Sequence, residues 1–271
     1  MELAVVEETN TTAPTNVYLV RNFLEEVASS RQAALLLDFD GTLAPFRIDR
    51  FNSRPWAGVV QLLDEIQREG RTRLALVTGR PAREASLLLG LTSTLEVWGL
   101  HGVERLYPNG RLETDELLPS EVAALNGARN AIASAQLGLL IEEKRNAVVV
   151  HWRGIPRRMI AGARERSVDL LRPFAEGGRM QMLLFDGGVE LRAGRHKGDA
   201  VREVLTELPE QSPVAYLGDD TTDEDAFRAL EGRGLGVLVR KTKRPSAAQV
   251  WLRPPGQLRD FLRGWLGAVR S

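Results

Sequence analysis

Apolar residues in the first part of the chain gather in short continuous runs, and longer amphipathic segments separate these runs. The apolar runs predict strands that are buried on both faces, at residues 33–39, 72–80 and 95–102. The segments in which apolar residues recur every three or four positions predict helices, at residues 17–29, 55–69 and 81–89. Strands that alternate with helices in this way are typical of a parallel sheet with right-handed crossovers.

The pattern changes after residue 103. The stretch 104–113 contains Pro108-Asn109-Gly110, a strong turn signal between two short strand-like runs. A helix, two adjacent strands, a second helix and two further strands are then predicted, at residues 120–136, 138–144, 147–153, 156–175, 180–186 and 189–192. This order predicts an α+β module, in which helices cover one face of an antiparallel sheet.

The first pattern returns from Lys197 onward. Helices are predicted at 197–208 and 223–230, strands at 213–218 and 235–239, and a C-terminal helix from residue 256. We therefore expect an α/β protein, with a Rossmann-like parallel-sheet core domain and an inserted α+β cap domain. The core is expected from residues 1–108 plus 193–271, and the cap from residues 109–192.

The composition narrows the class of protein. The chain has 271 residues, 43% of them apolar, which is enough for a core domain and a second domain. Its 36 basic and 36 acidic residues balance, so no overall charge draws it to nucleic acid or to a membrane. It has no cysteine, which excludes disulfides and thiolate chemistry. The sequence shows no signal peptide and no long apolar span, so we expect a soluble cytoplasmic protein.

Two aspartates, Asp38 and Asp40, follow the first apolar run in the stretch DFDGTLAP (38–45). In an extended backbone, side chains two positions apart point the same way, so both carboxylates face one small volume. Open α/β sheets bind ligands at this edge, beyond the carboxyl ends of their strands. A helix cap would explain a single aspartate, but two like charges at close range cost free energy unless a partner offsets them.

Two further motifs indicate a phosphate site. Thr78, Gly79 and Arg80 follow the second predicted strand, where a hydroxyl group and main-chain N–H groups before a helix can hold a phosphate. Lys197 begins the helix after the cap, where its charge would balance a phosphate and a nearby carboxylate. Taken singly, a capped helix start and a solvated lysine are the ordinary explanations of these residues.

The acidic stretch GDDTTDED (218–225) is the fourth motif, and it includes Asp219 and Asp223. Carboxylates at the start of a helix interact favourably with the helix dipole. This many carboxylates beside a glycine turn are more typical of a site for a hard cation, and carboxylate oxygens suit Mg²⁺.

The four motifs, in this order, resemble those of the haloacid dehalogenase superfamily. The segment 41–77 is too short for a large cap, whereas 79–196 can hold the α+β module, and this arrangement resembles the C2-capped branch. Within that branch the chain resembles the trehalose-6-phosphate phosphatases. The similar stretches are DGTLAP (40–45), GLHGVE (99–104), EEKRNAVVVHWR (142–153), VELR (189–192) and GDDTTDE (218–224).

The resemblance implies a Mg²⁺-dependent phosphatase that acts through an aspartyl-phosphate. Asp38 is the expected nucleophile, Asp40 the acid and base, and Lys197 the group that stabilises the charge. The expected metal ligands are Asp38, Asp40, Asp219 and Asp223. The residues expected to bind substrate are Thr78, Gly79, Arg80 and His101 in the core, and Glu142, Lys144, Glu190 and Arg192 in the cap.

The sequence motifs indicate the type of reaction more firmly than they indicate the substrate. The chain departs from the common family residues at Ala44, Thr78, Glu143 and Trp152. A phosphatase for glucosyl- or mannosyl-3-phosphoglycerate or for a simple sugar phosphate stays open, as does a non-catalytic sugar-phosphate sensor. Glu142 and Glu190 would repel the carboxylate of a phosphoglycerate, which favours a neutral sugar. A separate trehalose-6-phosphate synthase is the expected functional partner.

Overall fold

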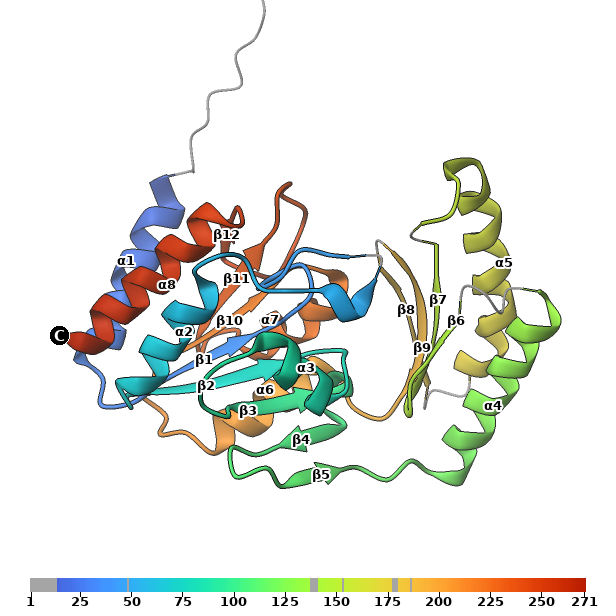
Figure 1. Cartoon of the computed structure of the whole chain (residues 1–271), viewed down its shortest axis with the longest axis horizontal. Coiled ribbons are helices and arrows are strands. Elements are labelled where there is room, and N and C mark those ends of the chain that lie inside the picture. The colour runs from blue at the N-terminus through green and yellow to red at the C-terminus, as the bar shows by residue number, and fades with distance from the viewer. Residues whose placement is uncertain (1–13, 48, 137–140, 153, 177–179, 186) are drawn as a thin grey trace, which may run out of the picture.

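The computed structural model describes residues 14–47, 49–136, 141–152, 154–176, 180–185 and 187–271, which form two parts, each built on one sheet (Figure 1). The larger sheet has the strand order β12-β11-β10-β1-β2-β3-β4-β5. Its strands are β1 (Ala33–Leu37), β2 (Thr72–Val77), β3 (Glu96–Gly99), β4 (Glu104–Leu106), β5 (Leu112–Thr114), β10 (Val214–Gly218), β11 (Leu235–Val239) and β12 (Val250–Leu252). Neighbours from β12 to β3 pair in parallel, and β4 and β5 are antiparallel additions at one edge.

Helices cover both faces of the larger sheet. One face carries α1 (Pro14–Ser29), α2 (Val59–Arg68), α3 (Ala82–Leu89) and α8 (Gly256–Arg270), and the other carries α6 (Lys197–Thr206) and α7 (Glu224–Ala229). Alternate residues of β1 serve the two faces: Leu35 and Leu37 pack in the first core and Ala34 and Leu36 in the second. All of β1 is therefore buried, which explains its continuous apolar run.

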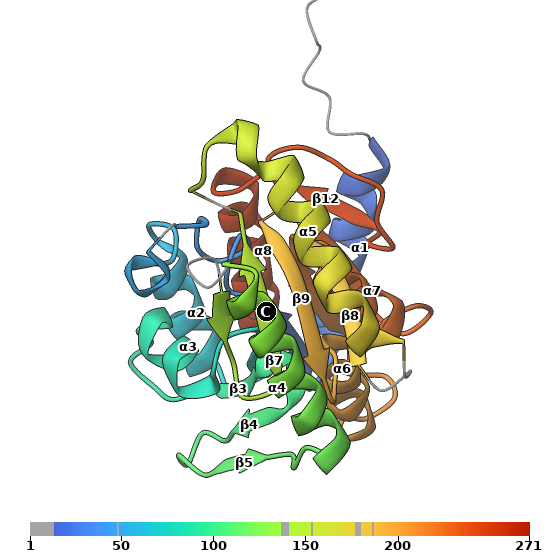
Figure 2. The ribbon, with the colours of Figure 1, turned by 90° about the vertical axis from the view of Figure 1, so that its right-hand side faces the viewer.

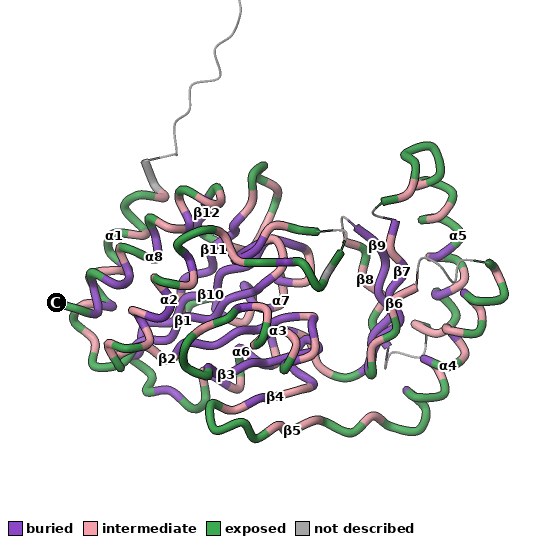
Figure 3. Tube along the Cα trace, viewed as in Figure 1, coloured by how far each residue is buried: buried purple, intermediate pink, exposed green. Residues whose placement is uncertain are grey.

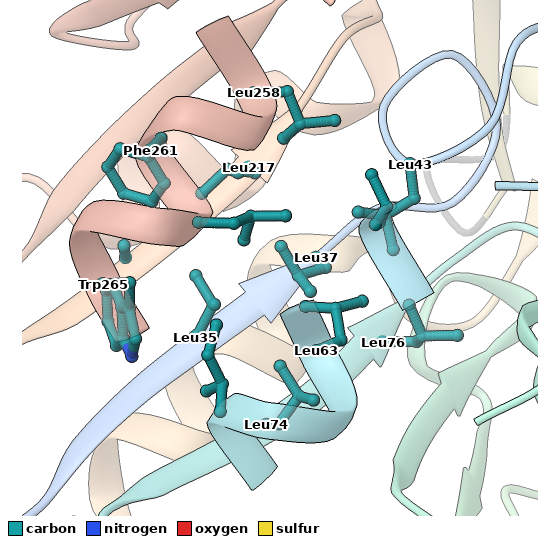
Figure 4. Close-up of a cluster of buried hydrophobic side chains, with 14 of the residues drawn as sticks. Leu35, Leu37, Leu43, Leu63, Leu74, Leu76, Leu217, Leu258, Phe261 and Trp265 are labelled. Atoms are coloured by element: carbon teal, nitrogen blue, oxygen red, sulfur yellow. The ribbon is translucent and has the colours of Figure 1, made fainter. Parts of the chain in front are cut away.

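Trp265 of α8 is one of the largest fully buried side chains of the first core. Its buried ring lies 5.9 Å from the ring of Phe23 in α1 and 6.2 Å from the ring of Phe261. Its Nε1 donates a hydrogen bond to Oγ1 of Thr72 at 2.9 Å, so the polar end of the ring is satisfied as well. Figure 4 shows Trp265 directed at the sheet beside Leu35.

The smaller part is the cap, an antiparallel sheet in the order β6-β7-β9-β8. Its strands are β6 (Ile141–Glu143), β7 (Ala147–His151), β8 (Met180–Phe185) and β9 (Gly188–Ala193). Helices α4 (Pro119–Ser134) and α5 (Arg157–Ala175) pack on the face away from the larger sheet (Figures 1 and 2). The central strands β7 and β9 of the cap are largely buried, whereas the outer sides of both helices are exposed (Figure 3).

The predicted order of elements and the α/β fold with an inserted cap are confirmed. The first boundary of the cap lies later than expected, because β4 and β5 pair with β3 and extend the larger sheet to Thr114. This hairpin belongs to the core domain, because Leu106 and Leu112 pack in the first hydrophobic core. Strand β12 was not predicted, since three residues give too short a pattern. The predicted strand residues 138–140, 153 and 186 lie outside the described residues. Among the described helices, none is long and apolar enough to span a membrane.

We expect Trp265→Ala to lower the free energy of unfolding by about 3–5 kcal/mol, because it leaves a cavity and removes the partner of Thr72. Urea denaturation followed by circular dichroism measures this change. Leu87→Ala is the control, since Leu87 is 82% exposed on α3 and should change stability by less than about 0.5 kcal/mol. Equal effects of the two substitutions would show that Trp265 does not organise the core.

Candidate active site

Three neighbouring strands of the larger sheet end in polar residues. Asp38 follows β1, Thr78 follows β2 and Asp219 follows β10, and parallel pairing brings these three to one edge of the sheet. A cavity of about 560 Å³ lies between this edge and the cap. Its lining includes the core residues Asp38, Asp40, Thr78, Gly79, Arg80, His101, Lys197 and Asp219 and the cap residues Glu142, Lys144, His151, Phe185 and Glu190.

Lys197 binds two carboxylates at the floor of the cavity. Its Nζ donates to Oδ1 of Asp38 at 2.6 Å and to Oδ1 of Asp223 at 2.7 Å, and all three residues are buried. Burial alone would lower the pKa of Lys197, but the charges of Asp223 and Asp38 outweigh it and raise that pKa. Lys197 is therefore a fixed positive charge, and the predicted grouping of Asp38 with Lys197 is present.

Asp223 forms hydrogen bonds with several residues around the acidic cluster. Its Oδ1 accepts hydrogen bonds from Lys197 and from the hydroxyl of Tyr216, at 2.5 Å, while its Oδ2 accepts from the main-chain N–H groups of Asp219 and Asp220 at 3.0 Å. Both oxygens thus already have two donors each. We infer that Asp223 positions the cluster and that the ligands turned toward a cation are Asp38 and Asp219.

The donor set fits a divalent cation with oxygen ligands. Carboxylate oxygens of Asp38, Asp219 and Asp223 lie within 4.8 Å of one another, and all three residues are buried. Burial raises the pKa of Asp38 to about 7 against the opposing effect of Lys197, and burial with the charge of Asp38 raises the pKa of Asp219 well above 3.8. A cation would offset this repulsion, because it binds the deprotonated carboxylates.

Gly41 is needed next to this cluster. Its φ is +88°, which favours glycine, and a Cβ atom there would lie 2.1 Å from Oδ2 of Asp219. The sharp exit after Asp40 therefore lets the carboxylate of Asp219 approach the main chain closely.

Arg80 forms hydrogen bonds with Asp40 as well as lining the cavity. Its Nε and Nη2 donate to the two oxygens of Asp40 at 2.5 and 2.7 Å, and its Nη1 donates to Glu84 at 2.6 Å. Burial alone would lower the pKa of Arg80, but these two carboxylates outweigh it and raise that pKa. Arg80 still lines the cavity, as expected, and it fixes the orientation of Asp40.

His101, Glu190 and Lys144 form a buried group where the core meets the cap. Nε2 of His101 lies 3.2 Å from Oε2 of Glu190, and Nζ of Lys144 donates to Oε1 of Glu190 at 3.2 Å. Burial lowers the pKa of His101 to about 4, so its imidazole is neutral at pH 7. Gly79 leaves room for this ring, because a Cβ atom at position 79 would lie 2.7 Å from its Nε2. The main chain of His101, in the short 3-10 turn Leu100–Gly102, has the uncommon φ of 61°.

Glu142 is held by a histidine that the sequence interpretation did not select. Nε2 of His151 lies 2.7 Å from Oε2 of Glu142, and the ring of His151 packs edge-on against Phe185 at 5.9 Å. The signal was available, because His151 follows Val149 by two positions and therefore shares its cavity-facing side of β7.

Arg192 differs from its predicted role in substrate binding. Its side chain is fully buried outside the cavity lining, and its Nη2 donates to Gln181 at 2.9 Å and to Asp225 of α7 at 3.5 Å. Arg192 shares a face of β9 with Glu190, but it lies two residues farther along the strand, over the core. It therefore connects the cap to α7.

Comparison with known proteins gives a family. The profile of the trehalose-phosphatase family matches residues 36–254. The trehalose-phosphate phosphatase of Mycobacterium marinum is 31% identical over 246 residues, which are 84% of this chain and 60% of that protein. The trehalose-phosphate phosphatase of Mycolicibacterium paratuberculosis is 30% identical over 253 residues, which are 86% of this chain and 62% of that protein. The chain thus spans about 60% of the length of these relatives.

Solved structures have the same fold. The C-terminal domain of the Candida albicans trehalose-6-phosphate phosphatase superposes with a TM-score of 0.77 at 18% identity, over 96% of this chain and 99% of that one. A trehalose-6-phosphate phosphatase related protein is 25% identical with a TM-score of 0.66, over 88% and 100%. A haloacid dehalogenase-like hydrolase of B. subtilis gives a TM-score of 0.56 at 14% identity, over 89% and 99%. The expected haloacid dehalogenase-type fold is confirmed.

The raised pKa of Asp38 predicts how pH changes stability without metal. Between its unfolded value of 3.8 and about 7, the folded chain binds the proton more tightly, so the free energy of unfolding falls as pH rises. His101, with its pKa lowered to about 4, acts in the opposite direction up to about pH 6.5. Subtracting the free energy of unfolding of Asp38→Asn from that of the wild type removes the effect of His101 and leaves that of Asp38. We expect this difference in the free energy of unfolding to fall by roughly 2–4 kcal/mol from pH 4 to pH 7.5.

Urea denaturation in EDTA, at several pH values, measures this difference. Adding a divalent cation should restore stability at pH 7.5 and have little effect at pH 4, because protonated carboxylates do not bind it. Parallel pH profiles for the two proteins would contradict the assignment of Asp38.

Proposed function

The chain belongs to the trehalose-phosphatase family, and from this premise we propose that it releases phosphate from trehalose 6-phosphate. The observation that carries the proposal is that one cavity has core residues at its floor and polar cap residues facing them. Asp38 and Lys197 lie at its floor, and the acceptors and donors of Glu142, Lys144 and Glu190 face it from the cap. The floor suits phosphoryl transfer, and the cap groups suit a ligand with many hydroxyl groups.

We assign the nucleophile to Asp38. One of its carboxylate oxygens forms a bond to phosphorus while the bond from phosphorus to the sugar oxygen breaks, giving an aspartyl-phosphate and the free sugar. Water then attacks the phosphorus, the aspartyl–phosphorus bond breaks, and phosphate leaves with the carboxylate restored. Lys197 donates a hydrogen bond to Asp38 and holds this carboxylate in a fixed position through both steps.

Asp40 is the proposed acid and base. It gives a proton to the sugar oxygen as that oxygen leaves, and it takes a proton from the attacking water, so the protons balance over one turnover. Arg80 donates to both oxygens of Asp40, a geometry that suits the base form. To act as the acid, Asp40 must release one of these two bonds, so substrate entry is expected to shift Arg80.

Thr78 and Gly79, which follow β2 and precede α3, are the proposed contacts of the phosphoryl oxygens. The chemistry of the cluster also fits Mg²⁺, with Asp38, Asp219 and the main-chain carbonyl of Asp40 as proposed ligands. When bound, Mg²⁺ would screen the repulsion between the carboxylates and the phosphate. We keep the cytoplasmic location and a separately encoded trehalose-6-phosphate synthase as parts of the proposal.

We expect phosphate release from trehalose 6-phosphate to exceed release from glucose 6-phosphate and glucosyl-3-phosphoglycerate, and to be lost in EDTA. Asp38→Asn should lower kcat by at least about 10³-fold, because an amide is a poor nucleophile. A colorimetric phosphate assay over this substrate panel measures both effects. Asp260→Asn on α8 is the matched control, since that side chain is 70% exposed and distant from the site.

Clear preference for another sugar phosphate would overturn the substrate assignment. Near-normal turnover by Asp38→Asn would overturn the mechanism, and binding of the sugar phosphate with no hydrolysis by the wild type would favour a sensor.

Neighbouring residues of β6 test the role of the cap. Glu142 lines the cavity, whereas Glu143 is 61% exposed and pairs with Arg129. We expect Glu142→Gln to raise the KM for trehalose 6-phosphate about 5- to 20-fold with a smaller change in kcat, because the amide also disrupts the contact with His151. Glu143→Gln should leave both constants within about twofold. Steady-state kinetics decides, and equal behaviour of the two variants would remove Glu142 from the substrate site.

A further inference from the structure

A loop of the core, described at residues 45–47 and 49–54, forms one wall of the active-site cavity and reaches toward the cap (Figure 1). It carries two exposed phenylalanines: Phe46 is 39% exposed and Phe51 is 64% exposed. Both side chains line the same cavity as Asp38. Because exposed aromatic rings gain free energy when an apolar surface covers them, their position at this cavity indicates a ligand that does so.

Hydrogen bonds hold the loop in shape before any ligand binds. Oδ1 of Asp49 accepts from the main-chain N–H of Phe51 at 3.0 Å, and Nη1 of Arg54 donates to the carbonyl of Phe51 at 2.9 Å. Phe46 packs against the turn at Gly41, where an added Cβ atom would lie 2.6 Å from its ring. The main chain at Phe51 and the ring of Phe46 are therefore held by the protein, which reduces the entropy lost on binding.

The two rings lie at different depths. Phe46 is beside Gly41, which in turn contacts Asp219 of the acidic cluster, so this ring is near the floor. Phe51 belongs to the 3-10 turn Arg50–Asn52 and is the more exposed of the two, so it lies toward the mouth. We therefore expect a ligand whose phosphate is at Asp38 to reach Phe51 with the end opposite the phosphate.

The facing wall of the cavity has the complementary chemistry. Ile141, Val149 and Phe185 give it apolar surface, and Glu142 and Lys144 give it polar groups. A pyranose ring has hydroxyl groups at its rim and an apolar C–H surface on its faces. Such a ring can place its rim against the polar groups of the cap and a face against an aromatic ring of the loop.

We propose that Phe51 is a specificity-determining residue, which supports the second sugar ring of a disaccharide phosphate. This inference rests on the proposed function and deepens it, because it assigns the recognition of the second ring to the core loop in addition to the cap. We expect a monosaccharide phosphate bound at Asp38 to end before Phe51 and therefore to gain little from this ring.

The test compares two substrates in two variants. Phe51→Ala should raise the KM for trehalose 6-phosphate about tenfold, equivalent to about 1.4 kcal/mol, with kcat within about twofold. Its kcat/KM for glucose 6-phosphate should stay within about twofold of the wild type, so the preference for the disaccharide falls about tenfold. Phe51→Trp keeps an aromatic face and should keep the preference. Leu87→Ala removes another exposed apolar side chain, outside the cavity, and is the control.

The outcomes separate the inference from the proposed function. If the wild type hydrolyses trehalose 6-phosphate but Phe51→Ala leaves the preference unchanged, only the inference is overturned. An equal loss on both substrates also overturns it, because it would show that the loop merely keeps the site intact. A wild type that releases no phosphate from trehalose 6-phosphate overturns both proposals.

Discussion

The active site depends on one buried ammonium group. Lys197 lies between Asp38 and Asp223, and its positive charge offsets the repulsion among the buried carboxylates of the cluster. Lys197 is 159 residues from Asp38 in the chain and begins α6, the first helix after the cap. The site can therefore form only after the chain has passed through the cap and returned to the core.

The two parts of the molecule divide the work. The parallel sheet brings Asp38, Thr78 and Asp219 to one edge, because neighbouring parallel strands end on the same side. The cap brings polar groups over that edge, and contacts across the gap close the cavity, such as those between His101 and Glu190 and between Thr221 and the carbonyl of Leu184. Because two chain segments join the cap to the core, we expect the cap to open for substrate and close over it.

The patterns with a strong local cause were predicted well. Buried strands gave continuous apolar runs, and the acidic residues after them were correctly expected at the cavity. Spacing does not reveal the partners of charged side chains. Arg80 lines the cavity as expected, but its contacts with Asp40 were not predicted. Arg192 was expected at the sugar, but it lies outside the cavity lining and donates to Asp225. Likewise the hairpin of β4 and β5 could have belonged to either sheet on its pattern alone.

The sequence by itself determined most of the elements, their order and the residues at the floor of the cavity, because hydrophobic periodicity and motif spacing are local properties of the chain. Only the tertiary structure decided which charges pair and which side chains share the cavity. We infer a positioning role for Asp223 from its four hydrogen bonds, and we propose Phe51 for sugar recognition because it lines the cavity together with cap residues. Such roles depend on distances between residues far apart in the chain, which packing alone sets.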